Sequence, residues 1–206
     1  MLNYRDAVLE PADAALYDAP NWLNDRCIHF GFKLLEDDLG EAAASVALVD
    51  PAVYSFMMLQ CDDDDEFADL GRGLAARGGG PPAVVATAVS DADALVVGGS
   101  SHWSLLVYWV AEDRSAHYDS LGHPKNARAA EAAAAKLARC FGRRAAPPDH
   151  ARTPRQTNGH DCGAFALAVA GAVLRGDAQL EAVTADAVAD LRRDLRARAA
   201  AMLDAA

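Results

Sequence analysis

A nearly continuous apolar run at 103–110, with the sequence WSLLVYWV, is the feature that most constrains the fold. Half-buried strands alternate apolar and polar side chains, whereas an unbroken run of β-branched and aromatic residues is typical of a strand buried on both faces. The polar residues 112–115 then favour a turn and 116–120 indicate a second short strand, so we expect a hairpin over 103–119. The run at 84–89 predicts a further strand.

Several other segments carry apolar side chains three and four positions apart, which predicts helices. These segments are 21–35, a stretch that begins at Pro51, 127–141, 162–174 and a stretch from about Asp186. In the first segment, Asn21 would cap the helix and Trp22 would lie in its first turn. In the last segment the apolar residues share one face, and we expect the other faces to be solvated. Those faces carry Arg192, Arg193, Arg196 and Arg198.

Three polar or breaker-rich stretches indicate loops between these elements. The acidic run at 62–66 is expected to be a solvated loop or the start of a helix, with a docking patch as the alternative. Glycines and prolines at 78–82 predict a surface loop. A short apolar piece at 95–97 leads into a further loop at 98–101, and 149–155 has the character of an extended segment at the edge of a sheet.

The bulk composition argues against several classes of protein. A length of 206 residues suits one domain, over 1–206, with a sizeable core. The net charge of −11 disfavours binding to a phosphate backbone, so we expect no nucleic-acid partner and a partner with a basic surface. No apolar run reaches the ~20 residues that cross a membrane, and the N-terminus lacks the layout of a signal peptide. We therefore expect no membrane association.

The cysteines indicate reduced thiols rather than disulfides or a metal site. Cys27, Cys61, Cys140 and Cys162 form no CxxC pair, and their spacings fit no familiar zinc motif. We expect neither a metal nor another cofactor. Free thiols in a chain of this size are typical of an intracellular protein, and we expect it in the cytoplasm, the nucleus or both.

Cys162 stands at the start of a predicted helix, directly after the polar segment 156–161. Asn158-Gly159 is a turn signal, and the apolar run follows at once. The partial positive charge at a helix N-terminus favours a thiolate, which is a nucleophile at neutral pH. The alternative is a small buried side chain that only begins a core helix, which is the commoner role of a lone cysteine.

A histidine and an aspartate favour the nucleophilic role for Cys162. His102 precedes the first strand of the expected hairpin and Asp119 ends the second, so the two can meet at one edge of the sheet. A carboxylate beside an imidazole fixes its tautomer and favours the imidazolium, which could pair with a thiolate. The side-chain amide of Gln156 could donate to an oxyanion, together with the backbone N–H of Cys162. Rival histidines, not at the mouth of the buried strand, are His117, His123 and His160.

The motifs that contain these residues resemble the Ulp/sentrin-specific protease family of cysteine peptidases. They are HWSL at 102–105, YDS at 118–120, QxNxxDCG at 156–163 and WLND at 22–25. The chain order His, Asp, Gln, Cys also fits that family and differs from the Cys-first order of papain. The 21–25 stretch, the strand beginning at His102 and the compactness of the chain are most similar to the deneddylase branch.

The resemblance implies an α+β, papain-like fold of the Ulp/adenain type, with a central mixed sheet flanked by helices. It implies cleavage after the C-terminal Gly-Gly of a ubiquitin-like modifier, most closely the neddylation modifier, by His102, Asp119, Gln156 and Cys162. Trp22 and Trp103 would frame a tunnel that admits only glycine, and Asp25 would contact the body of the modifier. The implied partners are the modifier and its conjugates, such as cullins, with the enzyme a monomer.

Three alternatives remain open from the sequence. The same chemistry could act on SUMO instead of the neddylation modifier. An inactive module could hold a modifier without cleaving it, although an intact set of four catalytic residue types disfavours this reading. A similar triad could also support acyl transfer to a protein hydroxyl or lysine.

Overall fold

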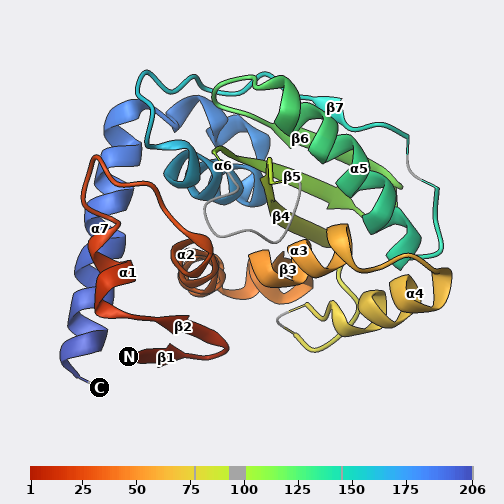
Figure 1. The fold of residues 1–206 in the computed structure, drawn as a ribbon, viewed down its shortest axis with the longest axis horizontal. Coiled ribbons are helices and arrows are strands. Elements are labelled where there is room, and N and C mark those ends of the chain that lie inside the picture. The colour runs from red at the N-terminus through yellow and green to blue at the C-terminus, as the bar shows by residue number, and fades with distance from the viewer. Residues whose placement is uncertain (77, 93–100, 145, 206) are drawn as a thin grey trace.

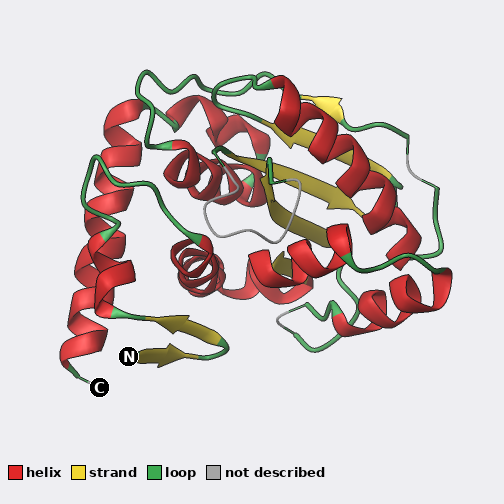
Figure 2. Cartoon of the chain, in the orientation of Figure 1, coloured by secondary structure: helices red, strands yellow, loops and turns green. Residues whose placement is uncertain are grey.

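A mixed β-sheet runs through the centre of the computed structural model, with helices on both faces (Figures 1 and 2). The structure describes residues 1–76, 78–92, 101–144 and 146–205. Within these residues the sheet has the order β3-β4-β5-β6-β7, and the outer pairs β3–β4 and β6–β7 are parallel while the inner pairs are antiparallel. The strands are β3 (Val46–Val49), β4 (Val84–Ser90), β5 (Trp103–Trp109), β6 (Arg114–Tyr118) and β7 (Asp149–His150).

The central strand β5 is buried on both faces, as its composition predicts. Leu105 and Val107 pack into one hydrophobic core, while Leu106 and Tyr108 pack into a second core on the opposite face. The first core is covered by α2 (Asp25–Leu39), α6 (Cys162–Arg175) and α7 (Ala185–Asp204). The second core is covered by α3 (Pro51–Leu59), α4 (Asp64–Gly73) and α5 (Pro124–Cys140). The expected hairpin is confirmed by the antiparallel pairing of β5 with β6.

The N-terminal segment packs beside α2 and α7 and away from the main sheet (Figure 1). It consists of the antiparallel pair β1 (Leu2–Tyr4) and β2 (Ala7–Leu9), followed by α1 (Pro11–Ala15). Two 3-10 helices, η1 (Gly40–Ser45) and η2 (Asp177–Ala182), connect longer elements elsewhere. Among the described residues, no helix combines the length and the apolar character that crossing a bilayer requires.

The cap of α2 is Asn24, so the expectation that Asn21 caps this helix is wrong. The side chain of Asn24 accepts a hydrogen bond from the backbone N–H of Cys27 at 3.0 Å. The side chain of Asn21 instead donates to the carbonyls of Ala15 and Asp18, which holds it in the preceding turn. Trp22 therefore lies in the segment before the helix rather than in its first turn.

The acidic run at 62–66 begins a helix, which confirms one of its two expected roles. The Asp63 side chain accepts from the backbone N–H of Glu66, and the Glu66 side chain accepts from the backbone N–H of Asp63. This reciprocal capping box satisfies donors that the first turn of a helix leaves free. The apolar piece at 95–97 and residues 98–100 of the loop after it lie outside the described residues.

Arg192 is buried, so the expectation that it lies on a solvated face of the last helix is wrong. Its guanidinium bonds to backbone carbonyls of the N-terminal segment and to Asp161. The expectation holds better for its neighbours, because Arg193 is exposed and Arg196 and Arg198 are half-buried. A periodic pattern separates apolar from polar side chains, and it does not identify a polar side chain whose acceptors come from a distant segment.

We expect Gly71→Ala to destabilise the fold, because α4 and α5 touch at this glycine. A Cβ on Gly71 would lie 1.9 Å from the backbone carbonyl oxygen of Cys140, which is too close for any side chain. Backbone atoms cannot move aside without shifting the helices, so the free energy of unfolding should fall by about 3 kcal/mol. Urea unfolding followed by circular dichroism measures the change.

Gly73→Ala is the matched control, since Gly73 ends the same helix and a Cβ there meets nothing within 4 Å. This substitution should leave stability unchanged or raise it by up to about 1 kcal/mol. Equal losses of stability in the two variants would contradict the close approach of the two helices.

Candidate active site

His102 and Asp119 meet at the open end of the β5–β6 hairpin, as the sequence predicts. The His102 Nε2 lies 2.6 Å from the Asp119 Oδ1, and both side chains are buried. The carboxylate is fixed from other sides, because it also accepts from the backbone N–H groups of Leu121 at 2.8 Å and His123 at 2.6 Å. The turn after β6 therefore wraps around Asp119 and holds its oxygens toward the imidazole.

The pair is charged at neutral pH. Burial lowers the pKa of His102, but the hydrogen bonds and the negative charges of Asp119 and Cys162 outweigh burial and raise it to about 9. Burial likewise raises the pKa of Asp119, yet its bond to His102 and its backbone N–H donors hold that pKa well below the usual range. An imidazolium and a carboxylate thus face one another, which is the arrangement that stabilises a nearby thiolate.

Cys162 is the first residue of α6 and is buried, and its thiol lies near enough to His102 to help raise the pKa of that imidazole. The expected position at a helix N-terminus is therefore confirmed. Since Nε2 of His102 is engaged by Asp119, the other ring nitrogen is left to exchange a proton with the thiol. The site thus contains a nucleophile (Cys162), a base beside it (His102) and an acid that orients the base (Asp119). This is the arrangement of a thiol hydrolase.

Asp91 is a site residue that sequence reasoning missed. Its carboxylate accepts from the backbone N–H of Ser101 at 2.6 Å, from the Ser101 hydroxyl at 2.6 Å and from the backbone N–H of His102 at 3.1 Å. Asp91 directly follows β4, so it joins the two ends of the β4–β5 connection and fixes the backbone of His102. An acid directly after a buried strand was the signal that could have indicated it.

Gln156 is buried and its amide is oriented by two hydrogen bonds. The Ser120 hydroxyl donates to Oε1 at 2.6 Å, and Nε2 donates to the backbone carbonyl of Asn158 at 2.7 Å. The amide nitrogen thus faces the loop that leads to Cys162. Because this nitrogen carries two hydrogens, a second one remains to donate to a substrate oxygen. The role of Gln156 in an oxyanion hole stays a prediction.

The remaining predicted site residues, Trp103, Trp22 and Asp25, differ in solvent exposure and in their distance from the nucleophile. Trp103 is buried, donates through Nε1 to the carbonyl of Leu23 at 2.9 Å, and lines a narrow gap together with Cys162. Trp22 does not line that gap and is 52% exposed. Asp25 is exposed at the start of α2. The structure thus brings Trp103 to the nucleophile and leaves Trp22 and Asp25 on the surface, where a protein partner could reach them.

Two of the three rival histidines, His117 and His160, have partners of their own. His117 bonds to Ser104 at 2.9 Å and to His150 at 3.0 Å, and burial lowers its pKa to about 4. His160 lies 3.7 Å from Asp161. The ring of His123 is 6.1 Å from that of His102 and takes a tilted orientation. His102 is therefore the histidine whose geometry suits a general base.

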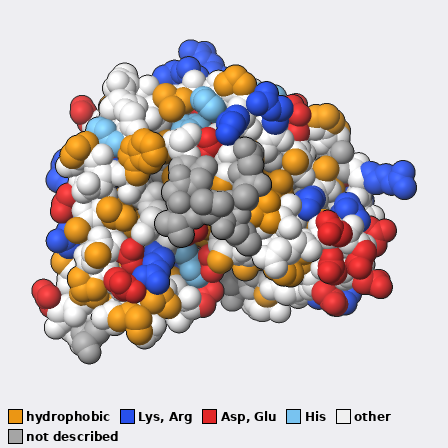
Figure 3. Space-filling model, viewed as in Figure 1, with side chains coloured by type: hydrophobic (Ala, Val, Ile, Leu, Met, Phe, Trp, Pro, Cys, Tyr) orange, Lys and Arg blue, Asp and Glu red, His pale blue; other side chains and the backbone are white. Residues whose placement is uncertain are grey.

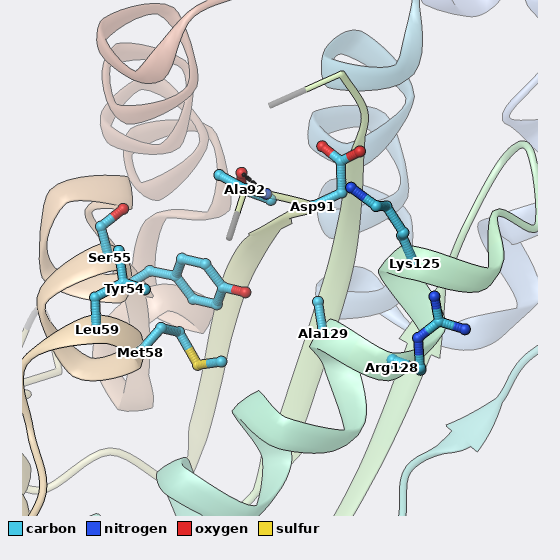
Figure 4. A pocket seen from close by; sticks show the side chains of 10 residues that line it. Tyr54, Ser55, Met58, Leu59, Asp91, Ala92, Lys125, Arg128 and Ala129 are labelled. Carbon is cyan, nitrogen blue, oxygen red and sulfur yellow. Dashed lines mark hydrogen bonds between the residues drawn. The ribbon is translucent and has the colours of Figure 1, made fainter. Parts of the chain in front are cut away.

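A separate pocket of about 430 Å³ lies between α3 and α5 (Figure 4). Tyr54 and Met58 face it from one helix, and Lys125 and Arg128 face it from the other, while Asp91 stands at its rim. None of the predicted site residues lines this pocket.

Acidic side chains gather elsewhere, over the exposed start of α4 (Figure 3). In the part of the chain that the structure describes, no cluster of three His, Cys, Asp or Glu side chains is arranged to hold a metal ion.

Comparison of the sequence with known proteins gives consistent matches. The Ulp1 protease family, C-terminal catalytic domain, matches residues 21–205, a range that contains all the predicted site residues. Human sentrin-specific protease 8 is 31% identical over 170 residues, which cover 81% of this chain and 77% of that protein. NEDD8-specific protease 1 of Arabidopsis thaliana is 29% identical over 170 residues, which cover 82% of this chain and 73% of that protein.

Solved structures share the fold at lower sequence identity. The C-terminal Ulp1 protease domain in complex with Smt3, the yeast ortholog of SUMO, superposes with a TM-score of 0.73 at 18% identity, over 95% of this chain and 84% of that one. The Xanthomonas campestris effector XopD bound to ubiquitin gives a TM-score of 0.60 at 24% identity, over 92% of this chain and 100% of that one. These likenesses confirm the expected Ulp-type fold with its mixed sheet.

We expect the His102 imidazole to lose its proton near pH 9, and at a much lower pH in Asp119→Asn. The folded state holds this proton more tightly than the unfolded chain does, where the pKa is about 6.5. The stabilisation that it provides is complete below that pH and is lost as the pH rises through about 9. Neutralising Asp119 leaves burial as the main influence, so the pKa of His102 should fall. An NMR titration of the imidazole C–H signals measures both values.

Asp190→Asn serves as the control for this titration, because it removes an exposed carboxylate of α7 that pairs only with Arg193 among the described residues. Its His102 titration should match the wild type. An unchanged midpoint in Asp119→Asn would show that the carboxylate does not sustain the imidazolium.

We expect Gln156→Ala to lower kcat by ~10²–10³, which is the usual cost of losing an oxyanion donor. Ser120→Ala should lower kcat in the same direction but less, because it only releases the amide from its orienting bond. Alkylation of Cys162 by iodoacetamide should change little in either variant, since the pair that sustains the thiolate is untouched. If alkylation and turnover fall together, Gln156 positions the nucleophile instead.

Proposed function

Since this chain belongs to the Ulp1 protease family of cysteine peptidases, we propose that it cleaves after the C-terminal Gly-Gly of a ubiquitin-like modifier. The observation that supports this most is the buried His102–Asp119 pair, which acts together with a cysteine at the first turn of α6 to raise the pKa of the imidazole. Relatives named as sentrin-specific protease 8 and NEDD8-specific protease 1 favour NEDD8 as the modifier. Precursor processing and the release of NEDD8 from conjugates both require this bond cleavage.

The reaction follows from the geometry of the site. The Cys162 thiolate attacks the carbonyl carbon of the terminal glycine, and the carbonyl oxygen becomes an oxyanion that Gln156 Nε2 and the Cys162 N–H stabilise. Collapse of this intermediate expels the lysine or peptide amine, which takes its proton from the His102 imidazolium. Neutral His102 then removes a proton from water, and the hydroxide attacks the thioester. The modifier leaves as a carboxylate, and the thiolate–imidazolium pair is restored.

Selection of the modifier is assigned to surfaces outside the catalytic centre. A passage that admits only glycine is shared by any modifier with a Gly-Gly end, so it selects the tail but not the body. Asp25 and the exposed acids at 62–66, in a chain of net charge −11, suit a partner with a basic face. The proposal extends to a single protease domain that acts as a monomer on conjugates such as cullins, in the cytoplasm or nucleus.

We expect kcat/KM for a fluorogenic NEDD8 substrate to exceed the values for SUMO and ubiquitin substrates by at least ~10²-fold, or ~3 kcal/mol of transition-state binding. Asp25→Lys should remove much of this advantage and weaken its dependence on salt, because one attractive contact becomes repulsive. A panel of the three substrates with each variant measures the effect. If SUMO is cleaved best, the peptidase chemistry stands and the choice of modifier is wrong.

Two controls separate the alternatives. Asp186→Lys places the same charge change at an exposed first-turn acid of α7, so it reproduces any effect on the helix dipole and should keep the preference. Cys162→Ala should bind the modifier without cleaving it. Wild-type protein that binds but never cleaves would instead be a silent module, and transfer of an acyl group from a donor substrate would indicate a transferase.

A further inference from the structure

Arg192 is 3% exposed, and its guanidinium joins two segments that flank Cys162 in space. It is carried by α7, on the opposite side of that helix from solvent. Its Nη1 donates to the Asp161 carboxylate at 3.1 Å. Its other nitrogens donate to backbone carbonyls of Tyr17 at 2.9 Å, Leu16 at 2.9 Å, Asn21 at 2.8 Å and Asp18 at 3.4 Å.

One branch of these contacts leads to the nucleophile loop, defined as residues 156–162. Asp161 directly precedes Cys162, and its second oxygen accepts from the Asn158 side chain at 2.7 Å. The backbone carbonyl of Asn158 in turn accepts from Gln156 Nε2 at 2.7 Å. Hydrogen bonds therefore link the guanidinium, through the side chain and the backbone of Asn158, to the amide that would stabilise the oxyanion.

The other branch leads to the lip segment, defined as residues 16–23. The carbonyls that Arg192 binds lie just before Trp22 and Leu23. The carbonyl of Leu23 receives the Trp103 Nε1, and the Leu23 side chain packs so closely on Gly163 that a Cβ there would be 3.0 Å from the Leu23 Cβ. The lip segment therefore holds the backbone on both sides of the exposed Trp22, and it supports the wall that Trp103 forms beside Cys162.

We propose that Arg192 is a positioning residue for the peptidase reaction, which locks the lip segment and the nucleophile loop into one rigid unit. The inference rests on the proposed function, because it assigns Arg192 to the alignment of Gln156 and Trp22 with a substrate that passes Cys162. Arg192 touches no reacting atom, and it acts through Asp161 and through the carbonyls of the lip segment.

The chemistry of the guanidinium explains why a lysine could not replace it. Arginine presents five N–H donors in a fixed plane, and here they serve a carboxylate and several carbonyls at once. An ammonium group has only three donors around one point, so it cannot serve all the acceptors that the two segments present. Arg192→Lys therefore keeps the positive charge while it separates the two branches.

The test compares Arg192→Lys and Asp161→Asn with Arg193→Lys, which changes an exposed neighbour on α7. On a fluorogenic NEDD8 substrate, Arg192→Lys should lower kcat by about 10- to 100-fold and raise KM, because both the oxyanion donor and the lip are misplaced. Asp161→Asn breaks only the branch to the nucleophile loop, so it should lower kcat and leave KM unchanged. Arg193→Lys should match the wild type.

Two readouts do not depend on turnover. Hydrogen exchange should accelerate in peptides covering 16–23 and 156–161 in Arg192→Lys, only in 156–161 in Asp161→Asn, and in neither in Arg193→Lys. The rate of Cys162 alkylation by iodoacetamide should stay close to the wild-type rate in all three, because His102 and Asp119 lie on other elements.

Several outcomes would overturn the proposal. Wild-type kinetics in Arg192→Lys would do so, as would a loss of activity in proportion to unfolded protein with no local change in exchange. If Arg192→Lys does not fold, a normal kcat in Asp161→Asn would overturn it. A wild-type protein that cleaves no modifier would refute the proposed function instead, while the exchange pattern would still decide whether Arg192 joins the two segments.

Discussion

The rest of the structure supports the buried hydrogen bond between His102 and Asp119. Two ionised groups in a buried position are costly unless each is held by further donors or acceptors. The turn after β6 supplies backbone donors to the carboxylate, and the β5–β6 pairing fixes the separation of the two side chains. That pairing depends on the two hydrophobic cores, because β5 lies between them and contributes alternate side chains to each. The packing of both faces is therefore transmitted to the active site through one strand.

Three aspartates each position another part of the site by accepting hydrogen bonds. Asp119 orients the imidazole, Asp91 fixes the backbone on which that imidazole stands, and Asp161 fixes the loop that delivers the nucleophile. Each lies just beyond the end of a strand or just before a helix. Asp119 and Asp91 accept from backbone N–H groups, whereas Asp161 accepts from the side chains of Arg192 and Asn158. A carboxylate in such a position accepts several bonds at once, so a short connection becomes rigid without a large apolar contribution.

The sequence predicted the parts that local composition encodes. The apolar run at 103–110 specified a strand buried on both faces, and the hairpin geometry then brought His102 to Asp119. The boundary of α2 was misplaced because Asn21 and Asn24 are equally good caps, and the choice depends on tertiary contacts such as the bond from Asn24 to Asp13 at 2.7 Å. The contacts of Arg192 could not be predicted, since its acceptors are the Asp161 carboxylate and backbone carbonyls about 175 positions earlier in the chain. The burial of Arg192 depends on the assembled fold, whereas the periodicity of apolar residues describes the faces of a single helix.

The contact between Arg192 and the lip segment also bears on when the protein matures during its synthesis. Chains emerge from the ribosome with the N-terminus first, and segments fold as their partners become available. Residues 16–23 and Cys162 are both made before Arg192, so the hydrogen bonds that join them through the guanidinium form only after α7 has emerged. A nascent chain would carry a thiol without an assembled cleft around it. Alignment of the active site is thereby tied to the synthesis of α7, and the position of Arg192 in the chain sets the order in which the cleft is completed.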